Sequence, residues 1–168
     1  MKFLFAAEAY WVWDRHEEDR SNCHIWIGAK NENGREWINE VLSRANEDGF
    51  YYQPRLDEEL LDLLPAGDVW ITTACVAGWK YRSEEEDRLK ALWKKLYDKH
   101  GDNFMFEVQY HPSERQKELN RYILELRKEI PAPIIMGCDR HYIDADGAEL
   151  RTDFLVSKEE RKAYADEE

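Results

Sequence analysis

The stretch HIWIGAKNENGREWINEVLSRANEDGFYYQP, from His24 to Pro54, decides the fold that we expect for this chain. Its first residues, up to Ala29, are rich in β-branched and aromatic side chains, which predicts a strand. From Asn31 to Asp48, apolar residues recur at steps of three and four, and this period predicts a helix that ends at Gly49. An extended segment follows up to Pro54. Alternation of strand and helix is typical of α/β folds.

The same alternation continues on both sides of this stretch. Proline, glycine and capping signals mark the helix ends, and Ser83 with Glu86 three residues later forms a capping box. Strands separated mostly by helices predict a parallel α/β sheet or barrel. The expected strands are 2–7, 24–29, 69–74, 104–109 and 134–138, and the expected helices are 31–48, 57–64, 83–100, 112–129 and 157–164.

The composition is that of one acidic, folded domain. Of the 168 residues, 43% are hydrophobic and 13% aromatic, which is enough to build a core. The formal net charge of -12 disfavours direct binding of nucleic acid, because that binding depends on Lys and Arg side chains that neutralise phosphates. Any action on DNA would therefore need another domain or chain to hold the nucleic acid. A cluster of acids that binds divalent metal would offset part of the charge.

Three cysteines without a Cys-x-x-Cys pair argue against a disulfide framework and favour a reducing, cytosolic setting. No apolar run approaches the roughly 18 residues of a membrane span. The apolar start up to Ala7 meets Glu8 too early for a secretion signal, so it predicts a core strand. Neither the glycine-rich patterns of nucleotide folds nor Gly-x-Ser-x-Gly occurs in the sequence.

Side chains that bind metals follow three of the expected strands. Glu8 follows the first strand, Cys75 follows the third, and Asp139 and His141 follow the last. In α/β barrels, chemistry collects where the strands end on the carboxyl face. Carboxylate, thiol and imidazole groups are ligands of zinc and related divalent ions. These strand ends therefore predict a metal site.

Each of these residues also has a plainer explanation. Asp139 and His141 suit a loop whose polar side chains meet water, and Cys75 suits a small buried hydrophobe. Glu8 has many Lys and Arg residues with which to pair. His24, at the start of its strand, suits a core histidine with satisfied hydrogen bonds. We expect the other histidines to lie at the surface or at a helix entry: His16, His100 and His111.

Several segments, in order and at natural spacing, resemble the PHP (polymerase and histidinol phosphatase) domain at the start of bacterial DNA polymerase III alpha subunits. The resemblance covers roughly residues 2–157, and GFYYQPR and CDRHY are its most specific parts. It implies a distorted (β/α)7 barrel of the TIM type with a three-metal site at its carboxyl face. The segments are EAYWVW from Glu8, CHIWIGAKNENGREWINEVLSRANEDGFYYQPRLDEELL from Cys23, ITTACVAG from Ile71, FMFEVQYH from Phe104 and MGCDRHYIDADGAELRTDFLV from Met136.

The resemblance also implies a set of metal ligands. Glu8 matches the family's bridging acid, and His24 matches the histidine of an HLxLLAKN-like segment. Cys75 matches the cysteine of an SGCLAG-like segment, and Asp139 with His141 matches an NDVHY-like pair. Some family members have lost these residues, whereas this chain keeps metal-binding types at all five positions. The implied cofactors are divalent metal ions: zinc first, with manganese and iron as alternatives.

The chain departs from the family pattern at its start. The family's first strand carries His-x-His and its second an Asp-His pair, but here Met1 stands just before the strand with Glu8, and no His-x-His occurs. We therefore expect a partial barrel that lacks its first two strands. Residues 1–156 would be a PHP-like domain of five β/α units, and residues 157–168 a charged helix or tail. Such a barrel exposes unpaired edges with apolar faces.

Five ligands can hold one or two ions, with water completing the shell, but not three. We therefore expect the chain to be one piece of a split polymerase subunit or a shortened member of the family. A third alternative is that the start of its gene was placed too late. The expected partner is a second polypeptide or an upstream segment that carries His-x-His, beside other polymerase subunits, with DNA contacted only indirectly.

For activity, the resemblance implies a metal-dependent phosphoesterase linked to DNA replication. It would hydrolyse a phosphodiester, as in 3′ to 5′ exonuclease proofreading, or pyrophosphate, with water activated by the metal. A non-catalytic assembly module of a split polymerase complex is the alternative. A third interpretation is an unrelated acidic α/β binding protein, in which Glu8, Cys75 and His141 would lie far apart.

Overall fold

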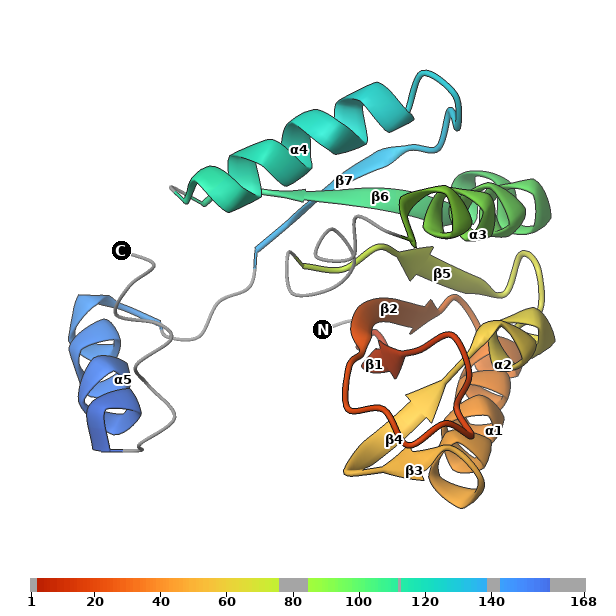
Figure 1. The fold of residues 1–168 in the computed structure, drawn as a ribbon, viewed down its shortest axis with the longest axis horizontal. Helices are drawn as coiled ribbons and strands as arrows, with labels where there is room; N and C mark the ends of the chain where they lie inside the picture. Colours follow the sequence, from red (N-terminus) through yellow and green to blue (C-terminus); the bar gives the residue numbers. More distant parts are fainter. Residues whose placement is uncertain (1–2, 76–84, 112, 139–142, 158–168) are drawn as a thin grey trace.

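The computed structural model describes residues 3–75, 85–111, 113–138 and 143–157. The strands within these ranges form one sheet in the order β3-β4-β1-β2-β5-β6-β7 (Figure 1). The strands are β1 (Ala6–Trp11), β2 (Cys23–Ala29), β3 (Phe50–Tyr51), β4 (Gln53–Leu56), β5 (Val69–Thr72), β6 (Phe104–Gln109) and β7 (Ile134–Gly137). The helices are α1 (Glu32–Glu47), α2 (Glu58–Leu63), α3 (Glu86–His100), α4 (Glu114–Leu126) and α5 (Ala145–Ser157), with a short 3-10 turn at Gly101–Asn103.

The sheet is mixed, so the predicted α/β class is confirmed but a purely parallel arrangement is wrong. β2 runs opposite to both of its neighbours, β1 and β5, and β3 runs opposite to β4. β1 and β2 follow one another in the chain, and so do β3 and β4. Consecutive antiparallel strands can be joined without a crossover helix. The other neighbouring strands are parallel. Closure of this sheet into part of a (β/α)7 barrel stays a prediction.

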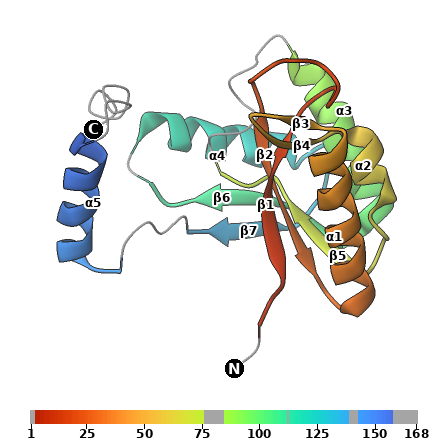
Figure 2. The same cartoon turned by 90° about the horizontal axis from the view of Figure 1, so that it is seen from below.

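Helices α1 to α4 pack against one face of the sheet, whereas α5 stands apart from it (Figures 1 and 2). The core lies between these four helices and the sheet, and it is continuous from α1 to α4. Along β2, Ile25 and Ile27 are buried in this core, and the alternate residues His24 and Trp26 point to the other side of the sheet. We call that other side, which carries Glu8, His24, Trp26, Thr72 and Glu107, the open face.

Helix ends follow the sequence signals closely. Asn31 caps α1 by accepting a hydrogen bond from the Gly34 backbone at 2.9 Å, and Asp57 and Ser113 cap α2 and α4 in the same way. α3 ends at Gly101, whose φ of 57° favours glycine. The expected starts at Ser83 and Pro112 and nearly all of the expected helix 157–164 lie outside the described residues. α5 was not expected.

The first strand lies later in the chain than predicted. Phe3 and Leu4 are 87% and 53% exposed, so the apolar start is not a core strand. The strand extends to Trp11 because the hairpin with β2 pairs Trp11 with Cys23, and the Trp11 side chain is buried in the core. Glu8 consequently lies within β1 rather than after its end.

Two predictions of burial are also wrong. The apolar run Pro133-Ile134-Ile135-Met136 predicts a buried strand, but β7 is an edge strand on which Ile135 and Met136 are 39% and 75% exposed. His100 was expected at the surface, yet it is buried at the end of α3. Among the described helices, none is long and apolar enough to cross a membrane.

Candidate functional site

Neighbouring strands bring three of the five predicted ligands together on the open face. Glu8 pairs in register with Trp26, two residues from His24, and side chains at such positions share one side of a sheet. Cys75 follows β5 by three residues, and β5 pairs with β2 through Thr72 and Trp26. The three side chains therefore come from adjacent strands, although they are far apart in sequence.

The contacts between them are direct. The Nδ1 atom of His24 lies 2.9 Å from Oε1 of Glu8 and 3.4 Å from Sγ of Cys75. The His24 side chain is 21% exposed and that of Glu8 51%, while Cys75 is buried. Carboxylate, imidazole and thiol groups are donor types that zinc takes in proteins. The donor chemistry of this group therefore fits a zinc ion.

The group does not form a complete metal site by itself. Glu8 and Cys75 contact the same nitrogen of His24, so these side chains bind one another. Within residues 3–75, 85–111, 113–138 and 143–157, no set of three or more His, Cys, Asp and Glu side chains is arranged to hold a metal ion. The other two predicted ligands, Asp139 and His141, lie outside the described residues.

A cavity of about 260 Å³ opens beside this group on the open face. Its walls come from β1, β2, β6, β7 and the residues that follow β5 and β7. Carboxylate, amide, aromatic and apolar side chains all contribute to it. The lining residues are Glu8, Trp26, Ala74, Glu107, Gln109, Ile135, Gly137 and Cys138.

Glu107 is a carboxylate of this cavity that the sequence did not assign to the site. Thr72 Oγ1 donates a hydrogen bond to its Oε2 at 2.8 Å, and Gln109 Nε2 donates to its Oε1 at 2.9 Å. A Cβ atom at Gly137 would lie 1.9 Å from Glu107 Oε1, so glycine leaves the space that the carboxylate occupies. The alternation of apolar and polar residues over 106–109 was the available signal, but it suited a contact with a neighbouring helix as well as a barrel interior.

The backbone is strained next to Cys75. Ala74 has a φ of 53° and is buried, and the left-handed conformation favours glycine because a Cβ atom is disfavoured there. Its backbone N–H donates to the hydroxyl of Thr72 at 3.2 Å, which closes a turn at the end of β5. This turn carries the chain from β5 to the position at which Cys75 contacts His24.

Two buried arginines fix the loop that joins β1 to β2. Arg15 forms ion pairs with Asp48 at 3.0 Å and with Asp57 at 2.8 Å, and its hydrogen bond lowers the pKa of the Asp48 carboxyl. Arg55, from the GFYYQPR segment, donates to three backbone carbonyls within the loop and to one just after the end of α1. These bonds hold the hairpin that carries Glu8 and His24. The acceptors of Arg55 are the carbonyls of Arg15, Glu17, Asp19 and Gly49.

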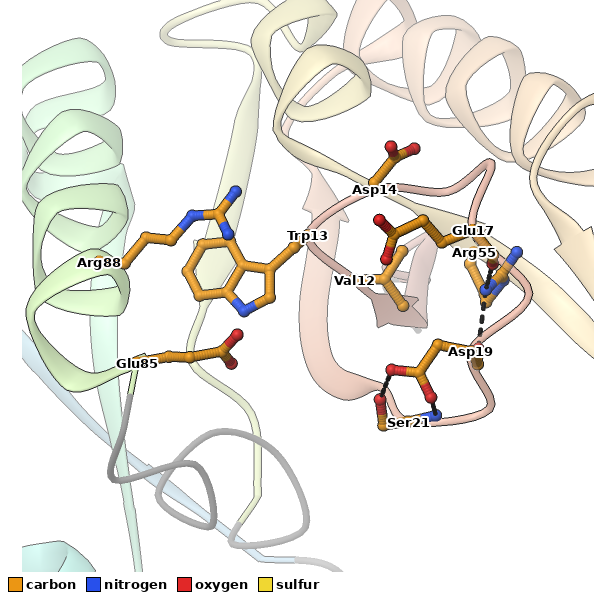
Figure 3. Close-up of a pocket in the computed structure, with 9 residues that line it drawn as sticks. All are labelled: Val12, Trp13, Asp14, Glu17, Asp19, Ser21, Arg55, Glu85 and Arg88. Atoms are coloured by element: carbon orange, nitrogen blue, oxygen red, sulfur yellow. Dashed lines mark hydrogen bonds between the residues drawn. The ribbon is translucent and has the colours of Figure 1, made fainter.

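A larger cavity of about 400 Å³ lies beside the same loop (Figure 3). Its polar groups largely serve structural contacts: the Arg88 guanidinium stacks on the Trp13 ring at 3.9 Å, Ser21 donates to Asp19, and Arg55 binds the loop carbonyls. None of the described candidate ligands lines it. The smaller cavity beside His24 is therefore the better candidate for a functional site.

Comparison with known proteins identifies the family. The family model described as PHP domain matches residues 1–111. The DNA polymerase III subunit alpha of Aquifex aeolicus is 32% identical over 131 residues, which cover 76% of this chain and 11% of that protein. The DNA polymerase III subunit alpha of Treponema pallidum is 27% identical over 167 residues, which cover 96% of this chain and 14% of that protein. DNA polymerase III PolC-type of Clostridium perfringens is 29% identical over 138 residues, which cover 76% of this chain and 10% of that protein.

These matches confirm the resemblance that the sequence motifs predicted. The chain spans between 10% and 14% of the length of these curated relatives. The family model covers the β1–β2 hairpin, α1, β5 and α3, and it includes Glu8, His24 and Cys75. The chain belongs to the PHP domain family, and it is similar to the PHP region of DNA polymerase III alpha subunits.

Proposed function

We propose that this chain is a metal-binding PHP module of a replicative DNA polymerase III alpha subunit. Its site would take part in the hydrolysis of phosphodiesters, as in 3′ to 5′ exonuclease proofreading. The observation that carries the proposal is the direct contact of Glu8 and Cys75 with His24 on the open face. The similarity to DNA polymerase III alpha subunits supports a role in DNA replication.

Zinc suits the donor set best, with manganese and iron as alternatives. Glu8, His24 and Cys75 would hold the first ion, and Asp139 and His141 would complete its shell. When bound, a divalent ion lowers the pKa of a water molecule and polarises phosphoryl oxygens. Metal ligands bind in their deprotonated forms, so metal affinity at such a site falls in acid.

The other side chains of the cavity would tune this site. Glu107 is fixed by Thr72 and Gln109, and it adds a second carboxylate to the cavity beside Glu8. Two carboxylates favour a divalent cation and repel an unaccompanied phosphate. The chain's own residues thus make substrate binding depend on metal.

A partner fits the same proposal. The open face and the apolar edge of β7 are surfaces that further strands of a (β/α)7 barrel would cover. A second polypeptide or an upstream segment that carries His-x-His would supply those strands and the remaining ligands. Residues 1–156 would then form the C-terminal five units of the barrel, followed by a charged tail.

An exonuclease assay tests the proposal. The chain, alone and mixed with a candidate partner that carries His-x-His, is incubated with zinc or manganese and a 3′-labelled single strand. We expect release of the 3′ nucleotide by the wild type and by His16→Ala, which alters an exposed histidine, but not by His24→Ala. Equal release by His24→Ala would contradict the proposed site. No release even with the partner would favour the assembly-module alternative.

A further inference from the structure

Trp26 forms an aromatic wall of the candidate site. It lies on β2, paired in register with Glu8 on β1 and with Thr72 on β5, so its side chain shares the open face with theirs. The indole is half-buried and lines the 260 Å³ cavity together with Glu8 and Glu107. Metal ligation does not require an aromatic ring at this position, so the ring needs another explanation.

Gly28 provides the space in which the ring lies. A Cβ atom at Gly28 would be 2.3 Å from Cη2 and 2.7 Å from Cζ3 of Trp26. The six-membered part of the indole therefore lies against the backbone of its own strand, in the volume that a side chain at position 28 would fill. A ring that is already held in place loses little conformational entropy when a flat ligand stacks on it.

The charges of the cavity make such stacking useful. The side chains that line it include two carboxylates but no Lys or Arg, so the described lining offers no cation to a phosphate. Affinity for a phosphate ester must then come from a bound metal and from the rest of the ligand. Stacking of a base on an aromatic side chain contributes about 1–3 kcal/mol and tolerates every base, because each has a π-face.

We propose that Trp26 stacks on the base of a nucleotide whose phosphate lies beside Glu8, His24 and Cys75. This inference rests on the proposed function and specifies its substrate class. The site takes a nucleotide with an unpaired base, and it discriminates against pyrophosphate and sugar phosphates, which offer no flat ring. The cavity is smaller than the roughly 300 Å³ at which ligand pockets usually begin, so it suits one base rather than a base pair.

The indole N–H resonances of the ¹⁵N-labelled chain test this inference, and the Trp26 signal is identified as the one lost in Trp26→Phe. With one equivalent of zinc, AMP should shift the Trp26 signal, whereas ribose 5-phosphate, which has the phosphate without the base, should not. Trp26→Leu should weaken AMP binding about tenfold, a loss within the range for stacking on one base. Trp70→Leu, at a half-buried tryptophan outside the cavity, should bind AMP like the wild type.

Three results would overturn the inference: an unshifted Trp26 signal at high AMP, equal binding of AMP and ribose 5-phosphate, or unchanged AMP binding by a folded Trp26→Leu variant. Adenosine separates this inference from the proposed function, because it has a base but no phosphate. A Trp26 shift with adenosine in a chain that binds no zinc would keep the stacking site and reject the metal site. Unchanged zinc content in Trp26→Leu would show that the wall acts on the ligand and not on the metal.

Discussion

The Nδ1 atom of His24 on β2 lies 2.9 Å from Oε1 of Glu8 on β1, across a hairpin whose connecting loop is fixed by buried arginines. Cys75 reaches the same nitrogen from the turn after β5. The candidate site thus depends on two backbone features, the fixed hairpin and the strained turn, as well as on its ligands. Each of these features leads to a prediction.

Glu8→Gln should weaken zinc binding at least tenfold and leave the fold intact. The substitution removes a charged oxygen donor, whereas the side chain is half exposed and contributes little to the core. Competition against a zinc-binding dye measures the affinity. Glu47→Gln, at an exposed position at the end of α1, is the matched control and should bind zinc like the wild type. Equal zinc affinity of the two variants would show that Glu8 is not a zinc ligand.

Ala74→Gly should stabilise the chain by about 0.5–1 kcal/mol. A φ of 53° costs alanine more than glycine, and relief of this strain exceeds the added flexibility of the unfolded chain. Urea unfolding measures the free energy. Ala45→Gly, on the buried face of α1 in its last turn, should instead destabilise by about 1 kcal/mol or more. Destabilisation of similar size at both positions would mean that Ala74 carries no strain.

Arg55→Leu should destabilise the chain by about 3 kcal/mol and also weaken zinc binding. The loss follows because buried carbonyls at Gly49 and Arg15, and the part-buried carbonyl of Glu17, would be left without their donor. The hairpin would then hold Glu8 and His24 less firmly. Arg35→Leu breaks only an exposed ion pair with Glu32 and should change little. A variant with reduced stability but wild-type zinc affinity would contradict the claim that this loop positions the metal ligands.

His100 should make the chain less stable in acid. Neither ring nitrogen has a hydrogen-bond partner among the described residues, and burial lowers the pKa of His100 from 6.5 to about 4. Between these values the unfolded chain binds a proton that the native chain does not, so stability falls as pH drops from about 6.5 to about 4. The total loss is on the order of 3 kcal/mol.

His100→Leu isolates this contribution from that of the carboxylates. Urea unfolding at pH values of about 7 and about 4.5 gives the pH dependence of each chain, and the wild type should lose more stability than the variant. His16→Leu, at an exposed position, should keep the wild-type pH dependence. The same pH dependence in wild type and His100→Leu would contradict the assignment.

Much of the fold could be predicted because local signals agree with tertiary packing. The apolar period of Asn31–Asp48 and the caps at Asn31 and Asp57 locate α1 and α2 within one residue. The burial of His100 could have been predicted from the sequence. His100 stands four residues after Leu96 and so continues the apolar stripe of Leu89, Trp93 and Leu96. The period of α3 therefore indicated a buried histidine.

The remaining errors concern strands, whose burial depends on their neighbours. The run from Phe3 to Trp11 is apolar over most of its length, and only the pairing with β2 decides that the strand begins at Ala6. β7 is apolar enough for a central strand, yet it lies at an edge. The places of Glu107 and Trp26 likewise depend on glycines in β7 and β2 whose close contacts only the structure reveals.

Metal content tests the central claim most directly. Purified wild type, His24→Ala, Cys75→Ala and Cys23→Ala are compared by mass spectrometry of bound metals, and Cys23→Ala is the control because Cys23 is a buried cysteine on the covered face of β2. The account predicts zinc, manganese or iron near one equivalent in the wild type and in Cys23→Ala, and loss of the metal in the other two variants. A folded wild type that holds no metal, or a Cys75→Ala variant that holds as much as the wild type, would contradict it.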